Sequence, residues 1–214
     1  MFPVTNLSTQ TAGAASARLP AVRVHTLARL AGVLGFAMAT ALSAQVAIPL
    51  PHTPVPVTLQ TLAVLLAGVT LGPRLGALSL ALYLLLGSAG YHFFAGGHWG
   101  FQTVLGATGG YLIGFLLAQP LLGLLTRRSW PLLGLYCGRA PHRAVDLVVA
   151  LLAANAVILG GGVTWLYFWS GAGLAATLSM GLWPFLPGEA AKTAAAFVLG
   201  RAALRYVRPW MDAD

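Results

Sequence analysis

Charged residues and cysteine are scarce in this sequence. Among 214 residues, charged side chains make up 7%, 4 residues are acidic and 1 is a cysteine, Cys137. A single cysteine cannot form a disulfide bond within the chain, and nothing near Cys137 has the spacing of metal ligands. So little charge cannot cover the surface of a water-soluble domain, and the composition therefore excludes a soluble globular protein.

Hydrophobic residues take the place of the missing charge. They make up 58% of the chain, and the mean hydropathy is +0.81. A helix needs about 20 mostly apolar residues to cross a membrane. The apolar runs that qualify or come close lie at about 26–48, 57–71, 75–87, 108–125, 145–168 and 188–207. The sequence therefore predicts an all-α integral membrane protein, with a disordered cytoplasmic tail at 1–22 and a single six-helix membrane domain at 23–210.

The basic residues predict the orientation of these helices. Arginines cluster around the start of the first run, between the second and third, between the fourth and fifth, and at the end of the sixth. The linkers after the first, third and fifth runs contain neither Lys nor Arg. This alternation follows the positive-inside rule, so both termini are predicted in the cytoplasm. The irregular segments at 49–56, 88–100 and 169–187 then lie outside, where they cover an outward-facing ligand pocket. Clusters of this kind, not interleaved with aromatic residues, favour membrane orientation over nucleic-acid binding.

The single lysine of the chain lies close to one of its few acids. Glu189 and Lys192 belong to PGEAAK, in an otherwise apolar stretch. An ionised pair there is unfavourable unless something repays its desolvation. The spacing puts both on one helix face, with Glu189 in the first turn, where the helix dipole favours an anion. The pair is either a self-contained interfacial ion pair or part of a ligand site, and ionisable residues within membranes favour the second interpretation.

Other polar or small residues are weaker candidates. Thr58 and Gln60 lie where an extended segment becomes helical, and Gln60 either bonds a polar edge of a ligand or caps loop backbone. Tyr111 follows a glycine-rich segment and is expected to form a pocket wall; that segment lacks the lysine of a phosphate-binding loop. Ala37 and Ala41 lie four apart on the first run, so another helix can approach closely there, within this chain or in a partner.

Histidines and an asparagine complete the set of polar candidates. His52, His92 and His98 lie on outer loops without the arrangement of a zinc site, so no metal is expected. Asn155, inside the fifth run, must find a partner in the bundle, and a structural role is expected for it.

Several segments, in order, resemble the BioY family of biotin-binding S components of energy-coupling-factor transporters. The resemblance covers roughly residues 30 to 205. It is carried by PVPVTLQTLAVLLAGVTLGPRLGALSLALYLLLGSAG, FAGG, LGATGGYLIGF and FLPGEAAK. The chain departs from the family pattern at Glu189, where an aspartate is expected, at Ala107 in place of a proline, and at His92, where a proline is common.

The resemblance implies a function and a set of partners. A BioY protein captures biotin from outside and works with a membrane T component and two cytoplasmic ATPases. It needs no cofactor, and biotin is its transported ligand. Phe94 and Gly97 of FAGG join the substrate-binding candidates, and Ala37 and Ala41 are expected to face the T component. The expected location is the inner (plasma) membrane of a bacterium, which the chain crosses several times.

Glu189 is predicted to accept a hydrogen bond from a ureido N–H of biotin. Lys192 is predicted to donate either to the ureido carbonyl or to the tail carboxylate, and both choices stay open. The alternative function is a self-sufficient, ion-coupled transporter, which normally places ionisable groups or broken helices near the membrane midplane. Asp146 lies instead at the end of a helix. Nothing in the spacing demands the acid, base and reacting centre of an enzyme.

Overall fold

The computed structural model describes residues 21–126 and 144–207, with side chains from residue 25 onward. The chain is mostly helical, as predicted. The elements are α1 (Ala21–Gln45), β1 (Ala47–Ile48), β2 (Val57–Thr58), α2 (Gln60–Ser88), a 3-10 turn (Ala95–Gly97), α3 (Phe101–Leu105), α4 (Gly109–Leu125), α5 (Ala144–Ser170), α6 (Leu174–Gly181) and α7 (Leu186–Tyr206). The predicted tail up to residue 20, Cys137, and the arginines at 127, 128, 139, 143 and 208 lie outside the described residues.

Within the described chain, 3 helices are long and apolar enough to cross a membrane. These are residues 25–45 of α1, the whole of α2 and the whole of α5. The apolar helix α4 is shorter. The helix α7 is less apolar than these, because it carries an acid, a lysine and two arginines among its 21 residues. The structure therefore agrees with a multi-pass helical membrane protein. The number of six crossings and the cytoplasmic location of both termini stay predictions.

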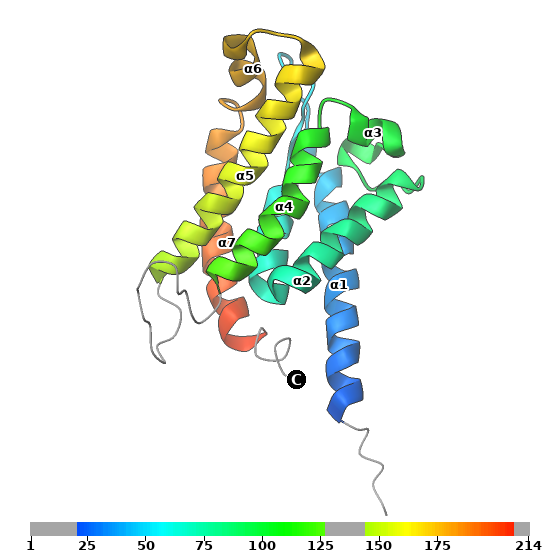
Figure 1. Cartoon of the computed structure of the whole chain (residues 1–214), viewed down its shortest axis with the longest axis vertical. Coiled ribbons are helices and arrows are strands. Elements are labelled where there is room, and N and C mark those ends of the chain that lie inside the picture. The colour runs from blue at the N-terminus through cyan, green and yellow to red at the C-terminus, as the bar shows by residue number, and fades with distance from the viewer. Residues whose placement is uncertain (1–20, 127–143, 208–214) are drawn as a thin grey trace, which may run out of the picture.

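The helix α2 is broken near its middle. Gly72 has φ +80° and ψ −176°, and Pro73 follows it. Glycine tolerates positive φ, and proline has no N–H to continue the helical ladder. The second and third apolar runs of the sequence are therefore two arms of α2 that meet at this break (Figure 1). Gly123 of α4 makes room for it, since a Cβ there would lie 2.3 Å from Pro73 Cδ.

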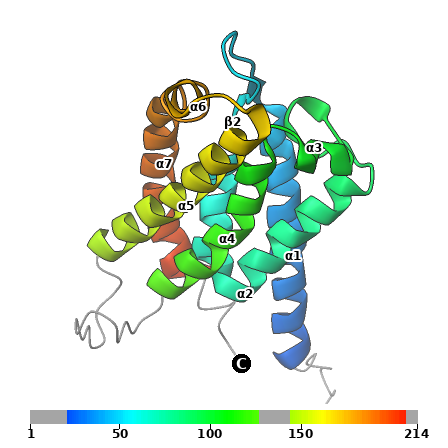
Figure 2. The ribbon, with the colours of Figure 1, turned by 45° about the horizontal axis from the view of Figure 1, so that its top comes forward.

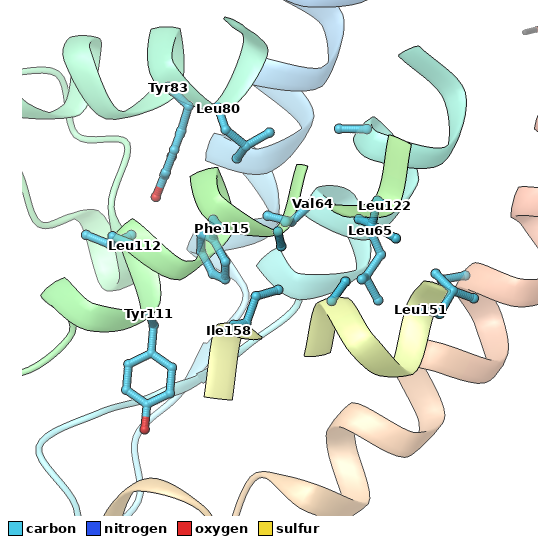
Figure 3. Packing of buried hydrophobic residues seen from close by; sticks show 14 of the residues in the cluster. Val64, Leu65, Leu80, Tyr83, Tyr111, Leu112, Phe115, Leu122, Leu151 and Ile158 are labelled. Atoms are coloured by element: carbon cyan, nitrogen blue, oxygen red, sulfur yellow. The ribbon is translucent and has the colours of Figure 1, made fainter. Parts of the chain in front are cut away.

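The helix α4 is central to the bundle and packs between α2 and α5. Close approach to α5 depends on glycine: a Cβ on Gly110 would lie 2.4 Å from the carbonyl oxygen of Gly161, and one on Gly114 would lie 2.9 Å from Ile158 Cα. Gly114 is therefore a packing residue between α4 and α5. The helix α1 packs on α2, and α7 packs on α2 and α5. Apolar side chains of α2, α4 and α5 fill the space between these three helices (Figure 3).

The small residues Ala37 and Ala41 of α1 lie inside the bundle. They are 1% and 4% exposed and belong to the buried hydrophobic core. This corrects the expectation that they face a partner subunit, because their small side chains let α1 approach α2 in the same chain. The small residues on the outer side of α1 are Ala31, Gly35 and Ala39, of which the first two are exposed and the third is half-buried.

The irregular segments gather at one end of the bundle. Figure 2 shows the β1–β2 hairpin, α3 and α6 at the end opposite the C-terminus of α7. The two strands pair antiparallel, with Ala47 opposite Thr58. The side chain of Gln45, at the end of α1, donates to the carbonyl oxygens of His92 (3.1 Å) and Phe94 (3.4 Å). These contacts fix the loop after α2 to the end of α1.

Candidate functional site

A cavity of about 710 Å³ lies among these segments. This size is typical of sites for small organic molecules. Its lining comes from the hairpin region, the start of α2, the loop at 94–99, the junction of α3 and α4, and the facing parts of α5 and α7. Much of the wall is apolar; it includes Phe94, Leu112, Phe115, Ile158 and Phe185. The buried polar side chains of the lining lie at the start of α2 and in the first turns of α7: Gln60, Thr61, Glu189 and Lys192.

Glu189 lies in the first turn of α7 and lines the cavity. It is 6% exposed. Its Oε1 accepts a hydrogen bond from Thr61 Oγ1 (3.0 Å) and forms an ion pair with Lys192. Among the described residues, nothing bonds its other oxygen, Oε2, although that atom is buried. The site thus contains a buried, charged acceptor with unused capacity beside an apolar wall.

Lys192 also lines the cavity and is 7% exposed. Besides the ion pair, its ammonium group donates to the backbone carbonyl of Thr58 (2.9 Å) and to Thr61 Oγ1 (3.4 Å). An ammonium group has three hydrogens, so these three acceptors can use all of them. Lys192 therefore joins α7 to the start of α2. Thr61 was missed by sequence reasoning, although it follows the candidate Gln60 directly in the chain.

Thr58, the last residue of β2, and Gln60, the first residue of α2, both line the cavity. The hydroxyl of Thr58 donates to Gln60 Oε1 (3.1 Å), while the backbone N–H of Gln60 donates to that hydroxyl oxygen (3.4 Å). Gln60 Nε2 donates to the hydroxyl of Tyr83 at 2.5 Å. The side-chain amide of Gln60 therefore contacts side chains in a buried setting and does not cap loop backbone.

Tyr111 lines the cavity from α4, close to Phe185. Its hydroxyl donates to the carbonyl oxygen of Gly181 (2.6 Å), at the end of α6. Gly162 leaves room for the ring, because a Cβ there would lie 2.2 Å from Tyr111 Cε1. The tyrosine is thus a wall residue and also fixes α6 to the bundle.

The two candidates from FAGG differ in position. Phe94 is 1% exposed and lines the cavity, whereas Gly97 is not among the lining residues. Gly97 has φ +77°, and a Cβ there would lie 3.8 Å from Gln45 Oε1. Direct ligand contact by Gly97 stays a prediction, and positive φ in the tight turn, favoured by glycine, accounts for a glycine at this position.

Asn155 connects α5 to the turn that holds Glu189. Its Nδ2 donates to Thr193 Oγ1 (2.5 Å), and that hydroxyl donates to the carbonyl oxygen of Glu189 (2.6 Å). The structural role expected for Asn155 is confirmed. Within the described residues, no group of three or more His, Cys, Asp or Glu could hold a metal ion. Of the loop histidines, His98 lines the cavity, and His52 and His92 do not.

Comparison with known proteins gives a consistent result. The sequence model described as "BioY family" matches residues 14–209. The "Probable biotin transporter BioY" of Pyrococcus horikoshii is 34% identical over 77% of this chain and 88% of its own length. The "Biotin transporter BioY" of Rhizobium etli is 32% identical over 73% and 82%. A crystal structure of "the S-component for biotin from an ECF-type ABC transporter" matches with a TM-score of 0.72 and 26% identity, over 85% of this chain and 93% of that one.

Proposed function

The chain belongs to the BioY family, and from this membership we propose that it is the biotin-binding S component of an energy-coupling-factor importer. It is a membrane transport protein and not an enzyme. The observation that carries the proposal is the buried Glu189–Lys192 pair at the wall of a cavity of about 710 Å³, with one carboxylate oxygen unbonded within the described chain. Leaving such an acceptor empty is costly, so a ligand donor is expected to meet it.

Biotin matches the chemistry of this cavity. Its ureido group offers two N–H donors and a carbonyl acceptor, its thioether ring is apolar, and its tail ends in a carboxylate. Glu189 Oε2 is the acceptor for a ureido N–H, and a bond from a neutral donor to a carboxylate is stronger than one between two neutral groups. The apolar wall, including Phe94, Phe115 and Tyr111, encloses the ring. Thr58 and Gln60 supply further polar contacts.

Lys192 donates to the ligand by exchanging one of its internal contacts. The contact to Thr61 Oγ1, at 3.4 Å, is the longest of the three and the easiest to exchange. The new acceptor is either the ureido carbonyl or the tail carboxylate. Comparing the affinities of biotin and biotin methyl ester separates the two: if Lys192 binds the tail, wild type discriminates between these ligands and Lys192→Ala does not.

Transport is proposed to require a membrane T component and two cytoplasmic ATPases, in the inner membrane of a bacterium. Because Ala37 and Ala41 are used within the chain, the outer face of α1 with Ala31, Gly35 and Ala39 replaces them as the proposed T-component contact. Ion coupling by this chain alone has less support. Asp146 and Glu189, the acids of the described chain, both lie in the first turn of a helix.

Calorimetric titration of the detergent-solubilised chain with biotin tests the proposal. We expect saturable binding with one biotin per chain, and unchanged biotin recovered afterwards. Folded, monodisperse protein without saturable binding would overturn the assignment of biotin as ligand. Uptake by the chain in membranes without T component and ATPases, driven by an ion gradient, would favour the ion-coupled alternative.

A further inference from the structure

We propose that Tyr83 is a positioning residue of the ligand site, which acts through the amide of Gln60. This inference rests on the proposed function, since biotin is taken as the ligand. Tyr83 is 0% exposed and is not among the residues that line the cavity. Its hydroxyl accepts the hydrogen bond from Gln60 Nε2, and Gln60 does line the cavity. Tyr83 therefore reaches the ligand only through its neighbours.

The break in α2 brings these two residues together. Gln60 and Tyr83 belong to one helix and are 23 residues apart in the chain. The arms contact each other closely nearer the break, where a Cβ on Gly76 would lie 3.3 Å from Gly68 Cα. Gln60 lies eight residues before Gly68, and Tyr83 lies seven residues after Gly76. Gln60 and Tyr83 are thus each about two helical turns from the contact between Gly68 and Gly76. Two arms that run antiparallel from the break bring residues at equal distances from it side by side.

The amide of Gln60 is held from two sides. The hydroxyl of Thr58 donates to Oε1, and Nε2 donates to Tyr83, so the oxygen and the nitrogen each have a fixed direction. An amide nitrogen carries two hydrogens, and Tyr83 uses one. The second can serve an acceptor in the cavity, such as the ureido carbonyl of biotin. Without Tyr83 the amide can rotate, and ligand binding must then supply the cost of ordering it.

The ring of Tyr83 supports a second part of the cavity wall. It packs edge to face against Phe94, with the ring centroids 5.6 Å apart and an interplanar angle of 83°. Gly87, one turn further along α2, leaves room for Phe94, because a Cβ there would lie 2.5 Å from the phenyl ring. Replacing Tyr83 by phenylalanine keeps this ring contact and removes the hydroxyl alone, which makes it a specific test.

The test is a double-mutant cycle in which biotin affinity is measured by calorimetry on folded, detergent-solubilised protein. The cycle compares wild type, Tyr83→Phe, Gln60→Leu and the double variant. We expect Tyr83→Phe to bind biotin about fivefold to tenfold more weakly than wild type. We expect the double variant to bind no more weakly than Gln60→Leu, since the hydroxyl has nothing left to position. Tyr91→Phe is the matched control: Tyr91 is exposed and does not line the cavity, and its variant should bind like wild type.

A second ligand separates positioning from general damage. In 2-iminobiotin a guanidino group replaces the ureido group, and at neutral pH it is protonated and offers only N–H donors, so a donor aimed at the carbonyl loses its acceptor. The preference of wild type for biotin over 2-iminobiotin should decrease in Tyr83→Phe. A merely structural role would lower both affinities together and leave their ratio unchanged.

Three results would overturn the inference: wild-type affinity in folded Tyr83→Phe, additive effects in the cycle, or an unchanged ligand ratio. If Tyr83→Phe does not fold, the double variant replaces both hydrogen-bond partners by apolar groups, which is far less costly than leaving one unpaired. Equal affinity of the double variant and Gln60→Leu then supports the inference, and a tenfold weaker double variant contradicts it. Wild type that fails to bind biotin overturns the proposed function, and this inference with it.

Discussion

Two of the clusters of buried polar groups in this apolar bundle have different surroundings. The first is the Glu189–Lys192 pair with Thr61, at the wall of the cavity. The second centres on Gln119 of α4, which is 0% exposed and donates to the backbone carbonyls of Val64 (3.2 Å) and Phe115 (3.0 Å). Each cluster contains an oxygen without a hydrogen-bond partner in the described chain, Glu189 Oε2 and Gln119 Oε1.

Only the first of these oxygens belongs to a residue that lines the cavity. Gln119 Oε1 lies instead against glycines of α2: a Cβ on Gly68 or Gly76 would lie 2.9 or 2.7 Å from it. The first cluster also carries charge, and the second is neutral. Burial and an unbonded acceptor are therefore not enough to indicate a ligand site. We therefore expect charge next to an open volume to distinguish binding from packing in this protein.

The largest expected effect follows from removing the lysine of the first cluster. Lys192→Ala leaves Glu189 buried without its counter-charge and releases the carbonyl of Thr58. Breaking a buried pair costs on the order of 3–5 kcal/mol. We expect a strong loss of thermal stability and of biotin binding, measured by thermal unfolding and calorimetry. Arg74→Ala, which removes an exposed cation, is the control and should change neither. Wild-type stability of Lys192→Ala would show that the pair is well solvated and does not form the proposed buried site.

Removing only the charge of Glu189 tests whether this cluster binds ligand. Glu189→Gln keeps the shape of the side chain but weakens its hydrogen bond to a ureido N–H. Biotin affinity should fall at least about tenfold, which corresponds to roughly 1.4 kcal/mol. Asp146→Asn, an equivalent change in the first turn of α5, should leave affinity unchanged, because Asp146 does not line the cavity. Equal biotin affinities for wild type, Glu189→Gln and Asp146→Asn would contradict the proposal that Glu189 binds the ligand.

The inner and outer faces of α1 carry small residues and no buried charge, so substitutions there can be compared with those in the charged cluster. Ala37→Leu inserts a larger side chain into the core, where overpacking costs about 1–3 kcal/mol of stability. Gly35→Leu points outward, where a Cβ would meet nothing within 4 Å. We expect Gly35→Leu to keep stability and biotin binding and to lower uptake when T component and ATPases are present. Normal uptake by folded Gly35→Leu would remove this face from the proposed interface.

The smallest effect is expected in the second cluster. Gln119→Leu replaces a partly bonded amide by an apolar group of similar size, so the gain from removing an unpaired oxygen offsets the lost hydrogen bonds. Stability should change by less than about 1 kcal/mol, and biotin affinity should stay within twofold of wild type. The comparison between the clusters fails if Gln119→Leu weakens biotin binding as much as Glu189→Gln does.

The sequence predicted the helices well where apolar runs are bounded by glycine and proline. The apolar runs at 57–71 and 75–87 are separated by Gly72 and Pro73, which stop a helix by local chemistry, and the break in α2 lies there. The contact between Glu189 and Lys192 follows from their helical spacing alone, whereas its burial does not. The structure has both features. They could be predicted from the sequence because each depends on residues only a few positions apart.

Long-range contacts could not be predicted in the same way. Tyr83 lies 23 residues from Gln60, and nothing local to either residue specifies their contact. Ala37 and Ala41 allowed a close helix contact, but their spacing does not say which helix approaches. Thr61 lies on a helix that is buried on most sides, so hydropathy cannot distinguish the side that faces the cavity. Gly97 has no side chain, and its backbone conformation was needed to explain it.

The break in α2 also has a consequence for biogenesis. At a rise of about 1.5 Å per residue, the arms at 60–71 and 73–88 are roughly 18 and 24 Å long, and each is shorter than a hydrocarbon core of about 30 Å. Neither arm is long enough to be a stable insertion intermediate by itself. We therefore expect the translocation machinery to release them into lipid as one hairpin. We also expect Arg74, which is exposed just after the break, to extend toward the nearest headgroups and the bilayer to thin locally around it.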